Sequence, residues 1–259
     1  NHFKGVIIGL SGGIDSALTL AIAHDALGPG SVMTVMMPSQ FTASMSLDDA
    51  ATQAQELKVS HEIIPIDASV KALSKSLPGE LGTQGIVQEN LQARVRSNIL
   101  MALSNARGVM LLSTSNKSEL AVGYSTLYGD LSGGFCALKD VYKTQVYALA
   151  RYRNTRSRVI PERVIERAPS AELRADQKDD DTLPPYDQLD AILKAHIEQG
   201  LSAQTIIDQG HNSDIVHDVL AMLYRSEYKR RQGPPGTKVS SKAFGRDRRF
   251  PMTSAFCGR

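Results

Sequence analysis

The chain has 259 residues and carries 29 Lys and Arg against 27 Asp and Glu, which gives a formal net charge of +2. Hydrophobic residues make up 42% and charged residues 22%, proportions typical of a globular protein with a sizeable core. No apolar run of about 18 residues predicts a membrane-spanning helix, and the first residues do not predict a signal peptide. The two cysteines exclude a disulfide framework and a Cys-x-x-Cys zinc site, so we expect a cytoplasmic protein.

The first half of the chain alternates strand and helix patterns. Short apolar runs predict strands buried on both faces at 6–10, 32–37, 61–66 and 109–112. Helical patterns lie between them at 16–27, about 46–57, where Ser46-Leu47-Asp48-Asp49 resembles a capping box, and 90–105. This order predicts an α/β fold with a doubly wound parallel sheet, whose ligands bind beyond the carboxyl ends of the strands.

The second half of the chain has a different pattern. Residues 154–185 are rich in charge and proline, which indicates a loop with short helical pieces. Further helices are predicted at 189–199, 203–209 and 215–231, followed by an irregular basic tail over 233–259. We therefore expect one domain over 1–259 with a helical C-terminal region.

Charge is distributed unevenly along the chain. Residues 1–150 carry 10 basic and 12 acidic side chains, whereas residues 151–259 carry 19 and 15, with most of the basic excess in 225–249. Such a segment is typical of a surface for nucleic acid, a membrane or a phosphorylated small molecule, and equally of a solvated face. Because aromatic residues do not alternate with the basic ones in the pattern of single-strand binding, we expect no nucleic-acid partner, and without a long apolar run we expect no membrane partner.

The strongest motif is Ser11-Gly12-Gly13-Ile14-Asp15-Ser16, which lies directly between the first predicted strand and helix. The glycines permit a tight turn close to an anion, and the helix N-terminus offers free N–H groups to a phosphate. Asp15 would repel a phosphate unless a cation lay between them, so the loop also predicts Mg²⁺. The loop is neither a Walker A motif nor the Gly-x-Gly-x-x-Gly motif of dinucleotide-binding folds.

This loop resembles the pyrophosphate-binding loop of the N-type ATP pyrophosphatases, which cut ATP between its α and β phosphates. Within that superfamily, a series of motifs resembles NAD synthetase over nearly the whole chain: 114–119, 123–130, 139–145, 169–173, 176–181 and 227–231. The segments 89–96, 152–154 and 243–249 are similar to the synthetase part of the glutamine-dependent branch. The resemblance implies an adenine nucleotide alpha hydrolase-like fold.

The resemblance also implies a reaction and roles for residues. ATP adenylates the nicotinate carboxylate of deamido-NAD, and ammonia attacks the adenylate to give NAD, AMP and pyrophosphate. The implied catalytic residues are Asp15, Glu119, Lys143 and Ser170, with Asp15 and Glu119 holding Mg²⁺. The implied ATP-binding residues are Ser11, Gly12, Gly13, Asp15, Ser16, Ser39, Thr114 and Lys143. The implied deamido-NAD-binding residues are Asn90, Arg94, Glu119, Asp130, Asp140, Lys229 and Arg230.

For some of these residues an ordinary structural role stays open. A lone glutamate such as Glu119 is usually a surface residue, Lys143 could be a solvated residue at the start of a helix, and Arg94 could form a surface ion pair. The acidic run at 179–181 would ordinarily be a solvated loop. A related ligase such as GMP synthetase, or a nucleotide-binding module without activity, also stays open.

The resemblance carries expectations about the whole protein. Residues 169–185 are expected to form a mobile segment that closes over the site and excludes water from the adenylate. The glutamine-dependent enzymes carry an N-terminal amidase domain that this chain lacks, so ammonia is expected from such a domain in a longer protein, or as free ammonia. The stretch 74–85 is short for the family. Family members associate through long helices, which predicts a homodimer at least, with the helix over 90–105 at the interface.

Overall fold

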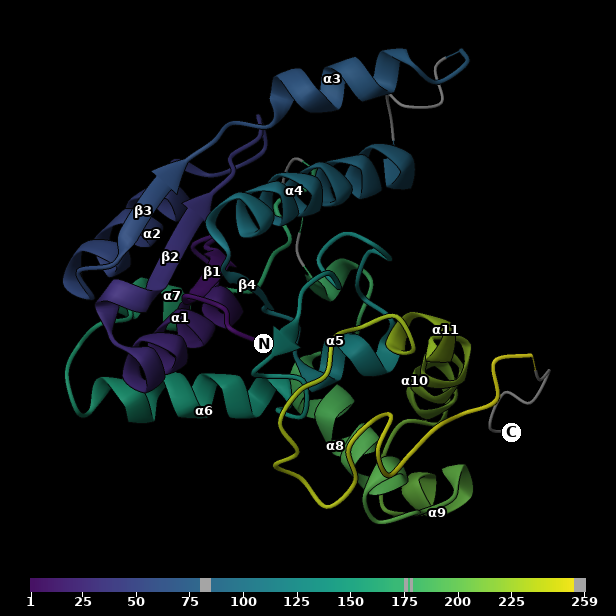
Figure 1. The fold of residues 1–259 in the computed structure, drawn as a ribbon. Helices are drawn as coiled ribbons and strands as arrows, with labels where there is room; N and C mark the ends of the chain where they lie inside the picture. The colour runs from purple at the N-terminus through teal and green to yellow at the C-terminus, as the bar shows by residue number, and fades with distance from the viewer. Residues whose placement is uncertain (80–84, 175–176, 178, 254–259) are drawn as a thin grey trace.

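The computed structural model describes residues 1–79, 85–174, 177 and 179–253. Figure 1 shows helices on both sides of a parallel sheet, with a second group of helices beside it. Part of the short 74–85 stretch, Asp176, Lys178 and the end of the tail lie outside the described residues. Within the described part, no helix is long and apolar enough to cross a bilayer.

A five-stranded sheet with the order β3-β2-β1-β4-β5 forms the centre of the fold, and all its strand pairs are parallel. Its strands are β1 (Val6–Gly9), β2 (Val32–Met36), β3 (Ser60–Ile63), β4 (Met110–Ser113) and β5 (Phe135–Cys136). The four predicted strands and the α/β fold class are confirmed, although β3 ends three residues earlier than predicted. The two residues of β5 are too few to give an apolar run that sequence analysis could detect.

Both faces of the sheet are covered by helices, which explains why the strands are apolar at nearly every position. Ile8 packs in a core cluster with residues of α1, α2, α6 and α7, whereas Ile7 packs on the other side with residues of α3 and α4. These helices are α1 (Ile14–Leu27), α2 (Ser44–Glu56), α3 (Asp67–Lys75), α4 (Gly85–Arg107), α6 (Lys143–Asn154) and α7 (Glu162–Glu166). A short 3-10 turn, η1 (Pro29–Ser31), leads into β2.

Two predicted helix boundaries are wrong, for identifiable reasons. The capping box at Ser46 does not form, because α2 begins at Ser44 and the buried Ser46 hydroxyl donates to Glu172 Oε1 at 2.6 Å instead. The helix predicted over 215–231 is divided in two at Ser226, whose hydroxyl donates to the Met222 carbonyl at 2.7 Å. Ser226 is thereby drawn back onto the preceding turn, where local hydrogen bonding competes with the helix.

The second group of helices has its own core, which includes Leu189, Ile192 and Leu220. Its elements are α5 (Lys117–Val122), η2 (Asp179–Asp181), α8 (Tyr186–Ile197), α9 (Ala203–Asp208), α10 (Ser213–Arg225) and α11 (Glu227–Arg230). The described part of the tail is irregular, as predicted, but Phe244 and Phe250 are buried in this core. The tail is therefore packed against the domain as part of the fold.

The packing of the tail gives a stability prediction. Phe244→Ala removes a side chain that is 6% exposed and should lower the free energy of unfolding by about 3 kcal/mol through the cavity it leaves. Val239→Ala, in the same tail, alters a side chain that is 63% exposed and should change the free energy of unfolding by less than about 0.5 kcal/mol. Urea unfolding monitored by circular dichroism measures both values. Equal effects of the two substitutions would contradict the packing of the tail.

Candidate active site

The loop between β1 and α1 is held in shape by its own serines. The Ser16 hydroxyl donates to the Gly13 carbonyl at 2.9 Å and accepts the Ser11 N–H at 3.2 Å. Gly12 has φ +80°, and a Cβ there would lie 2.4 Å from the Ser46 carbonyl oxygen, so glycine is required. Gly13 caps α1 without any side-chain hydrogen bond, which leaves the helix N-terminus open to an anion.

Three side chains from different elements meet beside this loop. The Lys143 ammonium, at the start of α6, lies 2.5 Å from Asp15 Oδ2 in α1 and 3.2 Å from Glu119 Oε1 in α5. Asn116 donates to Asp15 Oδ1 at 2.9 Å and also caps α5, where it forms a capping box with Glu119. The structure thus brings together the three predicted catalytic residues that carry charge, which lie in segments far apart in the sequence.

Burial controls the ionisation of this cluster. Desolvation raises the pKa of the Glu119 carboxyl to about 8, against the attraction of Lys143, while the neighbouring Asp15 and Asp179 carboxylates raise it further. Burial alone would lower the pKa of Lys143, but Asp15 and Glu119 outweigh it and the net pKa is raised, so the ammonium stays charged. Below about pH 8 Glu119 therefore keeps its proton, which a bound cation would have to displace.

Asp179 is a site residue that sequence analysis missed. Its side chain is 4% exposed and accepts the Tyr186 hydroxyl at 2.9 Å, whereas the acidic run to which it belongs was expected to be solvated. Burial raises the pKa of Asp179, against Lys143 and the Tyr186 hydroxyl. The sequence offers no helical signal for this burial, because Asp179 lies in the short turn η2 and Pro184-Pro185 separate it from α8.

The segment that precedes Asp179 is folded against the phosphate-binding loop. Arg167 donates to the Gly12 carbonyl at 2.7 Å, and Glu172 accepts from the Ser46 hydroxyl and from the Ala43 N–H. The Ser170 hydroxyl donates to the Gln177 carbonyl at 2.6 Å. Ser170 lines a small cavity of 160 Å³ together with further predicted residues: Ser11, Gly13, Asp15, Ser16, Thr114, Glu119 and Lys143.

A larger cavity of 610 Å³ adjoins the small one, and the two share wall residues such as Ser11, Thr114 and Asp130. It lies between α4 and the carboxyl ends of β1, β2 and β4. Its floor is apolar and includes Met37, Leu100 and Leu111. A cavity of this size, with an apolar floor and a few convergent polar groups, is typical of a site for a nucleotide-sized ligand.

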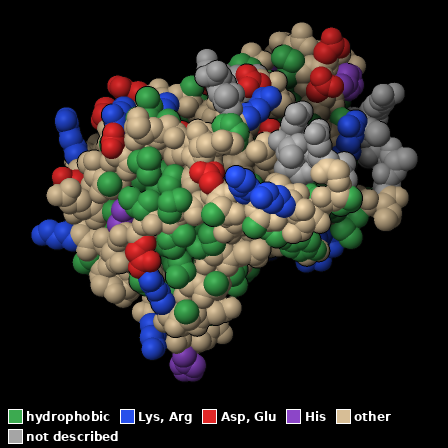
Figure 2. Space-filling view, turned by 90° about the horizontal axis from the view of Figure 1, so that it is seen from above, with side chains coloured by type: hydrophobic (Ala, Val, Ile, Leu, Met, Phe, Trp, Pro, Cys, Tyr) green, Lys and Arg blue, Asp and Glu red, His purple; other side chains and the backbone are tan. Residues whose placement is uncertain are grey.

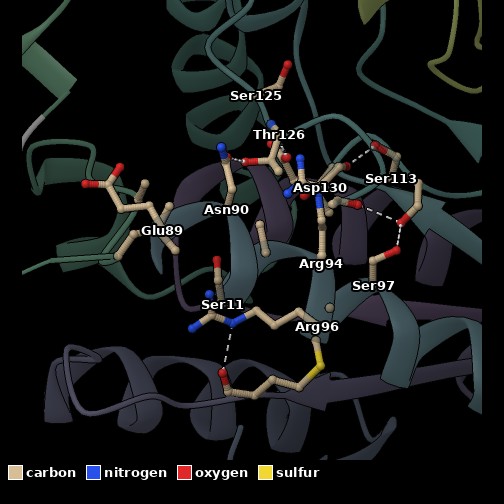
Figure 3. A pocket seen from close by; sticks show the side chains of 18 of the residues that line it. Ser11, Glu89, Asn90, Arg94, Arg96, Ser97, Ser113, Ser125, Thr126 and Asp130 are labelled. Carbon is tan, nitrogen blue, oxygen red and sulfur yellow. Dashed lines mark hydrogen bonds between the residues drawn. The ribbon is translucent and has the colours of Figure 1, made fainter. Parts of the chain in front are cut away.

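Four of the predicted deamido-NAD-binding residues line the larger cavity: Asn90, Arg94, Asp130 and Lys229. Figure 3 shows Asn90 beside Thr126, whose hydroxyl donates to Asn90 Oδ1 at 2.8 Å. Asp130 accepts the Thr126 N–H at 2.6 Å, and burial raises the pKa of its carboxyl to about 6. Lys229 donates to the carbonyls of Gly123 and Ser125, which fixes its ammonium at the rim.

Two other predicted ligand residues are corrected by the structure. Within the described residues, Asp140 and Arg230 line neither cavity, and they are 2% and 6% exposed. Both Asp140 oxygens accept hydrogen bonds from Lys117 or from residues 239–240. The Arg230 guanidinium donates to Glu227 and to the carbonyls of three residues: Leu120, Ala121 and Leu223. Their polar groups are used inside the fold, so both residues have structural roles.

Two predicted ATP-binding residues also lie outside the described cavity walls. Gly12 packs against Ser46, and its role is to allow that close approach. Ser39 is buried, and its hydroxyl accepts the Phe41 N–H at 3.3 Å, two residues after the cavity residue Met37. Their neighbours in the chain, Ser11 and Gly13 in one loop and Thr42 in the other, do line the cavities.

Comparisons with known proteins agree with this geometry. A family model described as NAD synthase matches residues 1–233. The glutamine-dependent NAD(+) synthetase of Acinetobacter baylyi is 55% identical over 258 residues, which cover 98% of this chain and 48% of that protein.

Two solved structures are also similar to the chain. The glutamine-dependent NAD+ synthetase from Acinetobacter baumannii, in complex with adenosine diphosphate, aligns with a TM-score of 0.63 at 49% identity, over 100% of this chain and 47% of that one. The NH3-dependent NAD synthetase from Campylobacter jejuni aligns with a TM-score of 0.72 at 29% identity, over 88% of this chain and 87% of that one.

The chain spans about half the length of the curated relatives it matches. The match to the family model nevertheless extends through both groups of helices and includes the phosphate-binding loop, the charged cluster and the walls of both cavities. These matches favour NAD synthetase over the GMP synthetase alternative. The chain belongs to the NAD synthase family.

Proposed function

We propose that this domain catalyses the ATP-dependent amidation of deamido-NAD, with ammonia as the nitrogen donor. The observation that carries the proposal is the cluster of Asp15, Glu119 and Lys143 at the junction of a phosphate-binding loop and a nucleotide-sized cavity. The names of the relatives support the substrate class, and the adenosine diphosphate bound to one of them supports the use of ATP.

In this proposal the ATP phosphates bind at the smaller cavity. Ser11, Gly13 and Ser16 offer hydroxyl and backbone groups at the N-terminus of α1, with Thr114 opposite them. The Lys143 ammonium neutralises charge that develops as the bond between the α and β phosphates breaks. Pre-positioned charge of this kind needs no reorganisation during the reaction, and the two carboxylates hold this ammonium in place.

The reaction has two steps, adenylation of the nicotinate carboxylate and attack by ammonia. A nicotinate oxygen of deamido-NAD attacks the α-phosphorus, and pyrophosphate leaves with the bonding electrons. The ammonia nitrogen then attacks the carbonyl carbon of the adenylate, AMP leaves with the carbon–oxygen bonding pair, and one proton is released from the nitrogen. Asn90, Arg94, Asp130 and Lys229 would bind deamido-NAD in the larger cavity. Ser170 and the 169–185 segment would cover the junction and keep water out.

Asp15 and Glu119 fit a magnesium ion. The described residues contain no cluster of three or more His, Cys, Asp and Glu side chains arranged to hold a metal by themselves. Magnesium in nucleotide sites is commonly held by one or two carboxylates together with substrate phosphates, and Asp15 and Glu119 lie on the same ammonium, so they are placed to supply two such carboxylates once Glu119 loses its proton. When bound, the ion would neutralise phosphate charge.

The rest of the proposal concerns the whole protein. The relatives' extra length supports an N-terminal glutaminase domain that supplies ammonia in a longer protein. A cytoplasmic location is part of the same proposal. A homodimer is supported by exposed apolar residues of α3 and α4: Leu73, Ile86, Val87 and Met101. Figure 2 shows hydrophobic side chains gathered on the face seen from above, the side of α3 and α4 in Figure 1.

The proposed reaction predicts which variants lose activity. Lys143→Met should lower pyrophosphate release by about 10²- to 10³-fold, because the transferred phosphate loses its charge partner. Lys194→Met removes an exposed lysine of α8 and should leave the rate unchanged. The assay uses Mg²⁺-ATP and deamido-NAD with ammonium or glutamine, and quantifies pyrophosphate and NAD. We expect NAD from ammonium and none from glutamine. Release of pyrophosphate with XMP but not with deamido-NAD would refute the proposed substrate.

The raised pKa of Glu119 predicts a pH dependence of magnesium binding. The folded chain keeps this proton up to about pH 8, against about 4.5 when unfolded, so the contribution of Glu119 to stability falls as the pH rises between these values. A cation competes with the same proton. With a non-hydrolysable ATP analogue present, we therefore expect the Mg²⁺ dissociation constant to rise by up to about tenfold per unit from pH 8 to pH 6.

Titration calorimetry measures this effect without turnover. Glu119→Gln should weaken Mg²⁺ binding and flatten its dependence on pH. Glu166→Gln removes an exposed acid of α7 and should leave the Mg²⁺ affinity and its pH dependence unchanged. An unchanged dissociation constant in the parent chain between about pH 6 and pH 8 would contradict the assignment of Glu119 to the cation.

The proposed dimer interface is tested by a charge on α4. Met101 is 38% exposed, and Met101→Glu should convert the dimer to a monomer, because an apolar interface core does not tolerate an unpaired charge. Tyr152→Glu on α6, at a side chain that is 66% exposed, should leave the dimer intact. Sedimentation velocity distinguishes the two species, and a monomeric parent chain would contradict the proposed dimer.

A further inference from the structure

Lys117 is completely buried, which is unusual for a lysine, whose ammonium ordinarily reaches solvent. Its ammonium lies 2.8 Å from Asp140 and 3.1 Å from Glu198, and donates to the Ser240 hydroxyl at 2.6 Å and to the Lys242 carbonyl at 3.0 Å. The charge is therefore fully paired by oxygens. Lys117 lines neither of the two cavities, so the proposed reaction makes no direct use of it.

Lys117 contacts the starts of two helices of the candidate active site, α5 and α6. It is the first residue of α5, and its N–H donates to the Val141 carbonyl at 2.8 Å. Its ammonium also lies 4.7 Å from the centre of the Tyr142 ring, and Tyr142 is the residue that precedes α6. Glu119 follows two residues later in α5, and α6 begins with Lys143. The side chain of Lys117 thus joins the starts of the helices that carry both residues.

The same cluster holds the C-terminal tail, through a segment over 234–242 that we call the strap. Asp140 accepts the N–H groups of Val239 and Ser240 at 2.8 and 2.7 Å, and the Ser240 hydroxyl at 2.8 Å. Gly236 packs on β5, where a Cβ would lie 2.4 Å from the Cys136 carbonyl oxygen. The strap therefore runs along the edge of the sheet and ends at the buried lysine.

We infer that Lys117 and Asp140 are positioning residues, through which the strap fixes the placement of Glu119 and Lys143. The inference rests on the proposed function, since it takes Glu119 and Lys143 to act on the ATP phosphates. Displacement of a charged group by about 1 Å can cost on the order of 100-fold in rate. Purely structural buried ion pairs, by contrast, can often be replaced by neutral groups without loss of stability.

That contrast gives a test that separates positioning from folding. The single variants Lys117→Met and Asp140→Asn each leave a buried charge without its main partner, so both should be less stable than the parent chain. The double variant removes both charges and should recover most of the lost stability in urea unfolding. We expect its kcat for pyrophosphate release to stay at least about tenfold below that of the parent, with the KM for deamido-NAD within about threefold.

Two further variants complete the experiment. Arg153→Gln breaks the ion pair with Asp25 at the far end of α6, and should cost stability but not kcat. Ser240→Ala removes the hydroxyl between Lys117 and Asp140 without changing any charge, and should lower kcat about threefold. If the double variant does not fold, the kcat of Ser240→Ala tests the positioning role in its place.

The outcomes distinguish the two proposals. If the double variant folds and has the kcat of the parent, the positioning role is overturned and the proposed function stays intact. If the double variant does not fold, an unchanged kcat for Ser240→Ala has the same meaning. If the parent chain releases no pyrophosphate under the same conditions, the proposed function fails and the positioning role fails with it.

Discussion

The contact of the Lys143 ammonium with the carboxylates of Asp15 and Glu119 joins three helices, and Asp15 lies 128 positions from Lys143 in the chain. Buried charge is tolerated only when it is paired, and breaking a buried pair typically costs about 3–5 kcal/mol. The contact therefore requires α1, α5 and α6 to begin close together at the carboxyl edge of the sheet. The parallel order of the strands meets that requirement, since it brings the loops after β1 and β4 side by side.

Burial has opposite effects on different parts of this site. It raises the pKa of the Glu119 carboxyl while Lys143 keeps its charge, so a cation bound at this site would compete with the Glu119 proton near neutral pH. Elsewhere, burial turns charged residues into structural ones, as at Asp140 and Arg230, whose polar groups are all used inside the fold. A place on a cavity wall therefore distinguishes the proposed ligand-binding residues from Asp140 and Arg230.

Sequence analysis predicted the parts of the fold that depend on local pattern. Four strands, the helices α1, α2 and α4 and the phosphate-binding loop follow from apolar runs and from glycines in a strand–turn–helix context, whereas α3 was not predicted. Asp15, Glu119 and Lys143 were named through a family resemblance, because no local pattern brings together residues from three helices. Asp140 and Arg230 were expected at the ligand but lie buried away from both cavities, because sequence motifs identify a segment but not the direction in which its side chains point. Asp179 was missed since a run of aspartates ordinarily stays in water.

The proposed function requires transfer of the AMP group to the nicotinate carboxylate before ammonia reacts. The direct test supplies deamido-NAD labelled with ¹⁸O in that carboxylate, together with Mg²⁺-ATP and ammonium, and examines the products by mass spectrometry. The account predicts that AMP carries one labelled oxygen and pyrophosphate none. Unlabelled AMP, formed while NAD accumulates, would contradict the proposed chemistry.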